Sequence, residues 1–276
     1  MRTLFIGLSA AASLASMSVQ ADQLADIQSR KSLTCAVQSS TPPFGFIDPQ
    51  TRNPSGHDVD LCRAIAEKIG VKAIIKPVAT EARVAELISG KVDLAVANLA
   101  YTSVRAKQIQ FSHAYYITSE VIVTPEERKH LTIADFRGLK LATPTGSTSE
   151  SAAKSNSIST IAFHDTASSY LSVMQNKAAG FVTSNITAKY YVHKSQDSDK
   201  KLAIIKQPLA IEPIGVGIRK DQPQLTDEVN KALIALEDEG TLTSIWNHWV
   251  GPTTYYGLER KDKVTPLEDI AINPDI

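Results

Sequence analysis

The stretch DVDLCRAIAEKIGVKAIIKPVATEARVAELISGKVDLAVANL, residues 58–99, decides the fold class. Leu61, Ile65 and Ile69 recur every four residues, which is the spacing of one helical face, and Gly70 ends the pattern. The other elements that we expect here are strands over residues 33–37, 71–77 and 92–99 and a helix over residues 80–89. The last strand is nearly continuous in apolar residues, as in a parallel sheet that is buried on both faces. This alternation of strands and helices predicts an α/β fold.

The same alternation begins again further along the chain. The elements expected there are strands over residues 140–145, 160–164, 180–183 and 202–206 and helices over residues 147–155, 168–177 and 186–194. A second lobe with its own sheet is the simplest arrangement for them. The extended segments 119–124 and 211–218 are suited to connect the lobes, and helices near Thr226 and Thr241 complete the fold. Because open α/β sheets bind ligands beyond the carboxyl ends of their strands, we predict a ligand cleft between the lobes.

The charge balance argues against a nucleic-acid-binding protein. The 276 residues include 29 Lys and Arg and 29 Asp and Glu, so the formal net charge is zero. Phosphate contacts need a surplus of basic side chains, and we therefore expect no nucleic-acid partner.

Residues 1–21 have the three-part pattern of a secretory signal peptide. Arg2 supplies the positive charge, residues 4–19 are apolar or small, and residues 19–21 fit a cleavage site. A membrane anchor is the alternative, but a span needs roughly 20 predominantly apolar residues, and Ser and Ala dilute this segment. We expect a free periplasmic protein.

The chain has two cysteines, Cys35 in an expected strand and Cys62 in the helix that follows. An even number in an exported chain favours a disulfide, because the compartment is oxidising. The alternative is a pair of buried free thiols, since cysteine is often simply a small buried residue.

The segment from Asn98 to Arg105 holds candidate ligand-binding residues. A buried strand ends there and a helix begins, with Thr102 as its expected N-cap, and free N–H groups at a helix start favour an anion. Arg105 adds a planar fork that is able to hold a carboxylate through two hydrogen bonds. The alternative is an ordinary surface arginine.

A second candidate is the loop Gly146 to Glu150, which follows the first strand of the second lobe. Ser147 and Thr148 either offer hydroxyl donors to the cleft or serve as plain helix caps.

Four motifs resemble those of the bacterial extracellular solute-binding protein family 3, the polar amino-acid-binding components of ABC importers. The first is Pro43-Phe44-Gly45-Phe46 with Asp48, and the second is the helix motif from Gly56 to Ala66, with His57 where Phe or Tyr is usual. The third runs from Arg83 through Gly90-Lys91-Val92-Asp93 to Thr102, Arg105 and Phe111-Ser112. The fourth is the loop from Gly146 to Glu150. The resemblance implies the two-lobed type II periplasmic-binding-protein fold, with a ligand cleft between lobes that two hinge strands join. It divides the chain into a signal peptide (1–21), lobe 1 (22–117 and 214–250), lobe 2 (118–213) and a C-terminal tail (251–276).

The resemblance also implies roles for individual residues. Arg105 would clamp the ligand α-carboxylate, with Thr102 and the backbone near Asn98 and Ala100 assisting from lobe 1. Thr148, in the same loop as Ser147, would assist from lobe 2. Arg83 would face the side-chain end of the ligand, which suits a polar or acidic group; the alternative is a solvated helix residue.

Three positions depart from the family pattern. Ser184 stands where an Asp normally receives the ligand ammonium, Thr41 where an aromatic side chain often stacks on the ligand, and Ala100 where Ser or Thr is usual. A neutral hydroxyl does not supply the charged partner that a desolvated ammonium needs. Asp165, at a nearby strand end, either substitutes for the missing Asp or caps a helix.

The resemblance implies a monomeric binding protein, without metal or cofactor, that captures a polar or acidic amino acid and delivers it to the membrane subunits of an ABC transporter. Ser184 favours another ligand, a carboxylate without an α-ammonium such as a dicarboxylate or hydroxy acid. A third alternative is an enzyme similar to the cyclohexadienyl dehydratases, with Glu150, Asp165 or Glu212 as its acid or base. These acids form no recognised catalytic constellation, so we expect no enzyme. A soluble ligand sensor is a further alternative.

Overall fold

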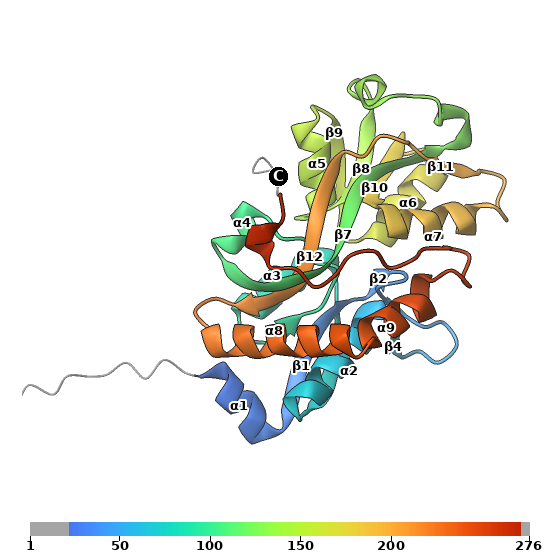
Figure 1. Ribbon diagram of the computed structural model, residues 1–276. Coiled ribbons are helices and arrows are strands. Elements are labelled where there is room, and N and C mark those ends of the chain that lie inside the picture. Colours follow the sequence, from blue (N-terminus) through green and yellow to red (C-terminus); the bar gives the residue numbers. More distant parts are fainter. Residues whose placement is uncertain (1–21, 272–276) are drawn as a thin grey trace, which may run out of the picture.

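The computed structural model describes residues 22–271, which form two lobes joined by two long strands (Figure 1). The predicted signal peptide, residues 1–21, lies outside the described residues. The first lobe, at the bottom of Figure 1, contains the helices α1 (Gln23–Arg30), α2 (His57–Ile69), α3 (Arg83–Ile88), α4 (Ser103–Ala106), α8 (Pro223–Asp238) and α9 (Thr241–Val250). The second lobe, at the top, contains α5 (Thr148–Ser155), α6 (Thr166–Met174) and α7 (Asn185–Ser195).

One sheet of nine strands runs through both lobes. Its order is β5 (Lys72–Val78), β1 (Ser32–Gln38), β6 (Leu94–Ala95), β12 (Ala210–Arg219), β7 (Ile109–Pro125), β10 (Gly180–Ser184), β8 (Lys140–Pro144) and β9 (Ser159–Phe163), and β11 (Leu202–Ile204) also pairs with β7. The strands β5, β1 and β6 are parallel, and so are β10, β8 and β9. A small second sheet contains β2 (Ser40–Thr41), β3 (Gly45–Ile47) and β4 (Pro54–Ser55). Short 3₁₀ helices are η1 (Thr80–Ala82), η2 (Glu126–Arg128), η3 (Ile133–Phe136) and η4 (Leu267–Asp269).

The predicted α/β class and two-lobed fold are confirmed, but the sheet differs from the expectation. Among residues 22–271 the second lobe has no sheet of its own, because β7 and β12 pair antiparallel with each other and continue into the strands of both lobes. These crossing strands are also longer than the expected segments 119–124 and 211–218. Ile117 pairs with Pro213, so the two expected lobe boundaries fall side by side. The division of the chain at those residues stays a prediction.

Three expected element limits are wrong. The expected helix 80–89 begins as the 3₁₀ turn η1 and is α-helical only from Arg83 to Ile88. The expected strand 92–99 pairs only over Leu94–Ala95, because the backbone then turns to make an isolated bridge between Ala100 and β12. Helix α8 begins at Pro223 instead of near Thr226, since proline fits the first helical turn.

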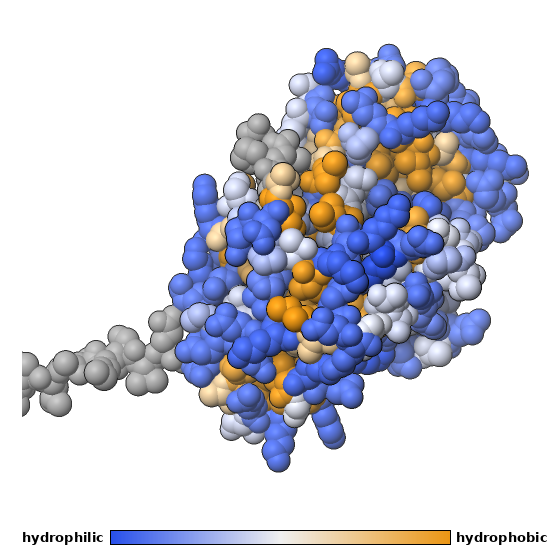
Figure 2. Space-filling model, viewed as in Figure 1, coloured by the Kyte–Doolittle hydropathy of each residue, from blue (hydrophilic) through white to orange (hydrophobic). Residues whose placement is uncertain are grey.

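The two lobes have largely separate hydrophobic cores. In the first lobe, α2, α8 and α9 pack together through buried residues such as Ile65, Leu233 and Trp246. In the second lobe, separate clusters form around Leu141 and around Tyr191. A change in the angle between the lobes therefore leaves most core contacts intact. The face shown in Figure 2 is mostly polar, with apolar side chains gathered over part of the second lobe.

Cys35 of β1 and Cys62 of α2 form a disulfide, as predicted. Both residues are fully buried in the first lobe. The bond ties the helix to the strand that it covers, and the free-thiol alternative is wrong.

The C-terminal tail, which follows α9, lies along the crossing strand β7. Thr265 and Ala114 exchange two backbone hydrogen bonds, and the Ile117 N–H donates to the Asp262 carboxylate at 2.8 Å. In Figure 1 the tail crosses between the two lobes as a dark red coil.

The tail also contacts each lobe. Arg260 is buried and donates to the Glu237 carboxylate of α8, with N···O distances of 2.9 and 2.7 Å. Lys189 of α7 donates to the Tyr256 carbonyl at 3.0 Å. The tail therefore links the first lobe, a crossing strand and the second lobe.

Candidate functional site

A cavity of about 370 Å³ lies between the lobes. Its lining comes from η1, α3 and α4 of the first lobe and from the loop before α5 and α5 itself in the second. The expected ligand-binding residues that line it are Arg83, Thr102, Arg105, Ser147 and Thr148. The cavity is thus at the carboxyl ends of the parallel strands, where α/β proteins bind ligands.

Arg105 bridges the two lobes inside this site. Its Nη1 donates to the Ala100 carbonyl of the first lobe at 2.9 Å, and its Nη2 donates to the Gly146 carbonyl of the second at 3.1 Å. The side chain is buried, and burial lowers the pKa of Arg105 while Glu212 and Glu120 act in the opposite direction. The surface-arginine alternative is therefore wrong.

The helix that begins beside Arg105 is shorter than the sequence suggested. α4 has only four residues, and its N-cap Thr102 already accepts the Arg105 backbone N–H at 3.1 Å. The cap thus leaves few free N–H groups at this helix start, and anion binding by Arg105 stays a prediction.

Arg83 is a second buried guanidinium. Its Nε donates to the Thr80 carbonyl at 2.9 Å, and its Nη1 donates to the Ala97 and Asn98 carbonyls at 2.9 and 3.1 Å. Burial and the neighbouring Arg105 lower the pKa of Arg83 to about 9, so it stays charged at neutral pH. Arg83 is not a solvated helix residue, because three carbonyls hold it inside the site.

Asn98 shapes the backbone that holds Arg83. Its φ of 46° lies in the left-handed region, which asparagine tolerates better than most residues, and turns its carbonyl to the guanidinium. Its N–H donates to the buried Asp58 carboxylate at 2.7 Å, and its side chain accepts a hydrogen bond from Tyr116. The backbone carbonyls of Asn98 and Ala100 thus hold Arg83 and Arg105, and their predicted contact with a ligand stays a prediction.

The loop of the second lobe combines the two expected roles. Ser147 caps α5, because its hydroxyl accepts the Glu150 N–H at 3.1 Å and donates to the Pro144 carbonyl at 2.6 Å. Thr148 faces the site instead, and its hydroxyl donates to Glu120.

Two buried acids lie on the crossing strands; they interact with Arg83 and Arg105 of the cavity but are not themselves part of its lining. Glu120 of β7 pairs with Ala210, and Glu212 of β12 pairs with Thr118, so both side chains share one face of the sheet as diagonal neighbours. Glu120 is 4 % exposed and accepts hydrogen bonds from Thr148 at 3.3 Å and Ser149 at 2.8 Å.

These acids differ in how their oxygens are satisfied. Glu212 is 2 % exposed, and its Oε1 has no hydrogen-bond partner among residues 22–271. Burial raises the pKa of Glu120, and burial together with the Glu120 carboxylate raises the pKa of Glu212 to about 8. Glu212 was a sequence candidate, whereas Glu120 was missed. A charged residue directly before the apolar run Val121-Ile122-Val123 was the signal that could have found it.

The other five expected site residues do not line the cavity: Asn98 and Ala100, described above, and Ser184, Asp165 and Thr41. Ser184 caps α7, with its hydroxyl accepting the Thr187 N–H at 3.4 Å. Asp165 caps α6 through the Ser168 N–H at 2.8 Å, as in the capping alternative. Thr41 is buried, and its hydroxyl has no partner in the described part of the chain.

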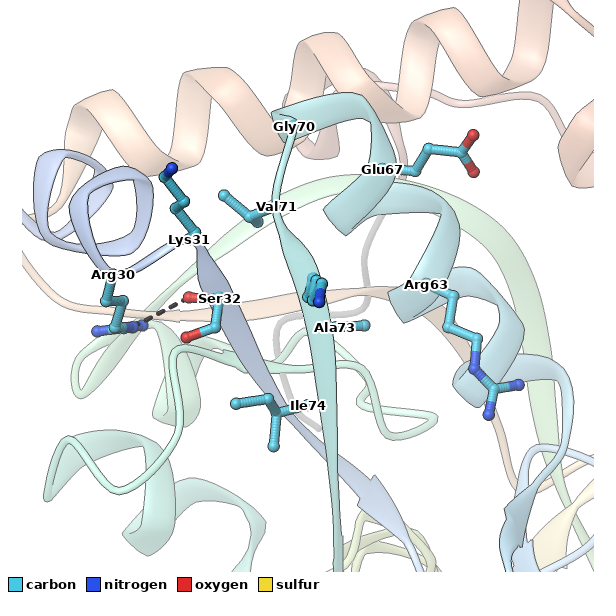
Figure 3. Close-up of a pocket in the computed structure, with 10 residues that line it drawn as sticks. Arg30, Lys31, Ser32, Arg63, Glu67, Gly70, Val71, Ala73 and Ile74 are labelled. Atoms are coloured by element: carbon cyan, nitrogen blue, oxygen red, sulfur yellow. Dashed lines mark hydrogen bonds between the residues drawn. The ribbon is translucent and has the colours of Figure 1, made fainter.

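A larger hollow of about 1010 Å³ lies elsewhere, on the outside of the first lobe (Figure 3). It runs beside β5, at the outer edge of the sheet, and in Figure 3 the side chains of Lys31, Arg63 and Glu67 point in different directions. Because these three charged side chains do not meet at one point, we do not assign the ligand site there.

Comparison with known proteins shows the family of this chain. The model of the bacterial extracellular solute-binding proteins, family 3, matches residues 33–252. The chain belongs to this family. The predicted resemblance is thereby confirmed, and family members are solute-binding proteins that act outside the cytoplasm.

Several relatives of this family member have names that state their ligands. The ABC transporter glutamine-binding protein of Bacillus subtilis is 25% identical over 242 residues, covering 86% of this chain and 87% of the relative. The L-cystine-binding protein of Escherichia coli K12 is 25% identical over 258 residues, covering 91% and 96%.

Solved structures show the same fold. An ancestral arginine-binding protein bound to arginine has a TM-score of 0.75 and 30% identity, covering 80% of this chain and 99% of that one. An ancestral amino-acid-binding protein, described as a precursor of cyclohexadienyl dehydratase, has a TM-score of 0.74 and 28% identity, covering 83% and 99%.

Residues 22–271 contain neither a helix suited to span a membrane nor a group of side chains suited to bind a metal ion. None of their helices combines the length and apolar character needed to cross a membrane. Within the same range, no three His, Cys, Asp or Glu side chains group in a way that could hold a metal ion.

Proposed function

We propose that this protein is the periplasmic binding component of an ABC importer and captures a polar or acidic amino acid between its lobes. The observation that carries the proposal is Arg105, which is buried in the interlobe cavity and donates hydrogen bonds to carbonyls of both lobes. A guanidinium in that place binds a ligand carboxylate and at the same time favours the closed arrangement.

Capture proceeds by closure about β7 and β12. The α-carboxylate of the ligand binds Arg105, with the hydroxyls of Thr102 and Thr148 beside it, and Arg83 faces its polar or acidic side chain. Contacts from both lobes bind the closed state more tightly than the open one, so the ligand shifts the population towards closure. The membrane subunits of the transporter recognise the closed monomer, which is secreted through the signal peptide, residues 1–21.

Ligand-induced thermal stabilisation tests this function. A ligand at 100 times its Kd stabilises the folded state by about 2.7 kcal/mol, and for a protein of this size that raises Tm by roughly 5–10 °C. We expect wild-type protein to show such a rise with at least one amino acid, and Arg105→Ala to lose it. Arg63→Ala, which removes an exposed arginine of α2, is the control and should keep the full rise. An Arg105→Ala protein that keeps the full rise would show that the carboxylate binds elsewhere.

The second ligand class is a carboxylate without an α-ammonium. Ser184 supports it, because this hydroxyl carries no charge and is engaged in the cap of α7. Screening amino acids against dicarboxylic and hydroxy acids in the same assay separates the two classes.

A dehydratase-like activity is a second candidate function. Glu212 supports it, because a buried carboxyl whose pKa is raised to about 8 holds a proton at neutral pH and could donate it to a leaving group. Incubation with prephenate and arogenate decides between the functions, since a binding protein saturates without forming product. We expect no turnover.

A further inference from the structure

The unpartnered oxygen of Glu212 is the starting point. Oε1 is buried, Glu212 interacts with Arg105 and Arg83 of the cavity lining, and Oε1 accepts no hydrogen bond from the described residues. A buried carboxylate without donors is costly, so such a group either keeps a proton or receives a cation.

The charged neighbours of Glu212 donate no hydrogen bond to its Oε1. Arg105 and Arg83 face it, but every hydrogen bond that the structure gives their guanidinium groups goes to a backbone carbonyl. Glu120, the other acid, takes its donors from Thr148 and Ser149.

We propose that Glu212, with Glu120 beside it, receives the α-ammonium of an amino acid whose α-carboxylate binds Arg105. The proposal rests on the proposed function and narrows its ligand class to zwitterions. An ammonium brings three N–H donors and one positive charge, which is what Oε1 lacks. Arg105 and Glu212 interact electrostatically, so an anion-binding and a cation-binding group adjoin, as two groups on one α-carbon require.

The charge balance of the site favours the same ligand class. Arg83 and Arg105 carry two positive charges beside Glu120 and Glu212, and the buried Asp58 also acts on Arg83. A zwitterion adds no net charge to this group, whereas a dicarboxylate would add two buried negative charges.

Neither other candidate partner for the ammonium is free. The Ser184 hydroxyl bonds within its own helix cap, and the two Asp165 oxygens hold the Ser168 N–H and the His164 ring. Ser184 of β10 pairs directly with Glu120 of β7, so the acid lies one strand away from the serine.

The test compares amino acids with their des-amino partners on matched variants. The probes are L-glutamine with glutaramate, L-glutamate with glutarate, and L-arginine with 5-guanidinovalerate, each titrated calorimetrically at pH 8. The variants are Glu212→Gln and the control Glu127→Gln, which makes the same change at an exposed residue of the second lobe that does not line the interlobe cavity. The Tm of each unliganded variant checks folding.

We expect wild type to bind at least one amino acid more than about 30-fold tighter than its des-amino partner, because an unpaired buried charge costs at least that much. Glu212→Gln should remove this difference by weakening amino-acid binding while des-amino affinity stays unchanged, and Glu127→Gln should keep the difference. Wild type that binds both partners equally would overturn the ammonium assignment while the carboxylate-binding function stands. A loss confined to L-arginine would assign Glu212 to a cationic side chain and also overturn the proposal. Wild type that binds none of the six probes would count against the proposed function itself.

Discussion

At the scale of single residues, Glu212 and Glu120 acquire their chemistry from the register of β7 and β12. Each acid would be an ordinary surface group in isolation, but the pairing places both on one buried face, beside two arginines. The site thus brings two arginines and several buried acids together in a medium that screens their charges weakly.

The elevated pKa of Glu212 gives the unliganded protein a pH-dependent stability. This carboxyl takes up a proton more readily in the folded than in the unfolded chain, where 4.5 is its ordinary value. Its contribution to stability is therefore complete below pH 4.5 and is lost as the pH rises through about 8.

We expect the Tm of unliganded wild type to fall between pH 6 and 9, by roughly 5 °C or more, and that of Glu212→Gln to change less. Thermal unfolding at each pH measures this. The groups that face Glu212 are Glu120, Thr148, Arg105 and Arg83. If the Tm of Glu212→Gln fell as much as that of wild type, Glu120 would be the acid that titrates.

At the scale of elements, the disulfide ties α2 to β1. Cys35 and Cys62 are 27 positions apart, and closing a loop of that length in the unfolded chain contributes about 3–4 kcal/mol in the chain-entropy model. Both sulfurs are buried, so a reductant reaches them only when the first lobe opens.

We expect the Cys35→Ala, Cys62→Ala double variant to lose roughly this much free energy of unfolding in urea while ligand affinity stays close to that of wild type, since the bond lies outside the interlobe cavity. Wild type in reductant should lose the same free energy of unfolding only after the lobe has unfolded once and the disulfide has been reduced. If the double variant were as stable as oxidised wild type, the disulfide would contribute no stability to the native lobe.

The sequence predicted those elements whose apolar pattern is local. The helix with Leu61, Ile65 and Ile69 was found almost residue for residue, because its spacing depends on four-residue neighbours alone. The crossing strand β7 was found only in part, since its residues 109–118 mix aromatic and polar side chains that pair with distant parts of the chain.

The site divides in the same way. Arg105 was predictable from its place after a strand and a helix cap, and the structure buries it between the lobes. Glu120 was missed: its place before an apolar run marks it as unusual, but its surroundings depend on Ala210 and Ser184, which become its neighbours only when the strands pair.

At the scale of the whole molecule, the two lobes keep separate cores and share β7, β12 and the tail. The tail is held to the first lobe by Arg260 and Glu237 and to the second by Lys189 and by the stacking of Tyr255 on His193, with ring centroids 4.1 Å apart. Burial alone would raise the pKa of Glu237, but hydrogen bonds from Arg260 and Lys263 lower it to about 2, so the first attachment persists at any physiological pH.

We expect the Lys189→Ala, His193→Ala double variant, which frees the second lobe from the tail, to bind its amino acid up to about 10-fold more weakly. The physical reason is that these contacts belong to the arrangement in which Arg105 bridges the lobes. Calorimetry on the variant and on a control, Lys206→Ala at an exposed position of the second lobe, measures the effect. An unchanged affinity would mean that the tail follows the lobes passively.

A tail that holds both lobes together makes ligand affinity partly independent of ligand selectivity. Substitutions along residues 255–265 alter the work of parting the lobes without altering any group that recognises cargo. Substitutions in this tail could therefore change the residence time of the bound solute while its selectivity stays the same.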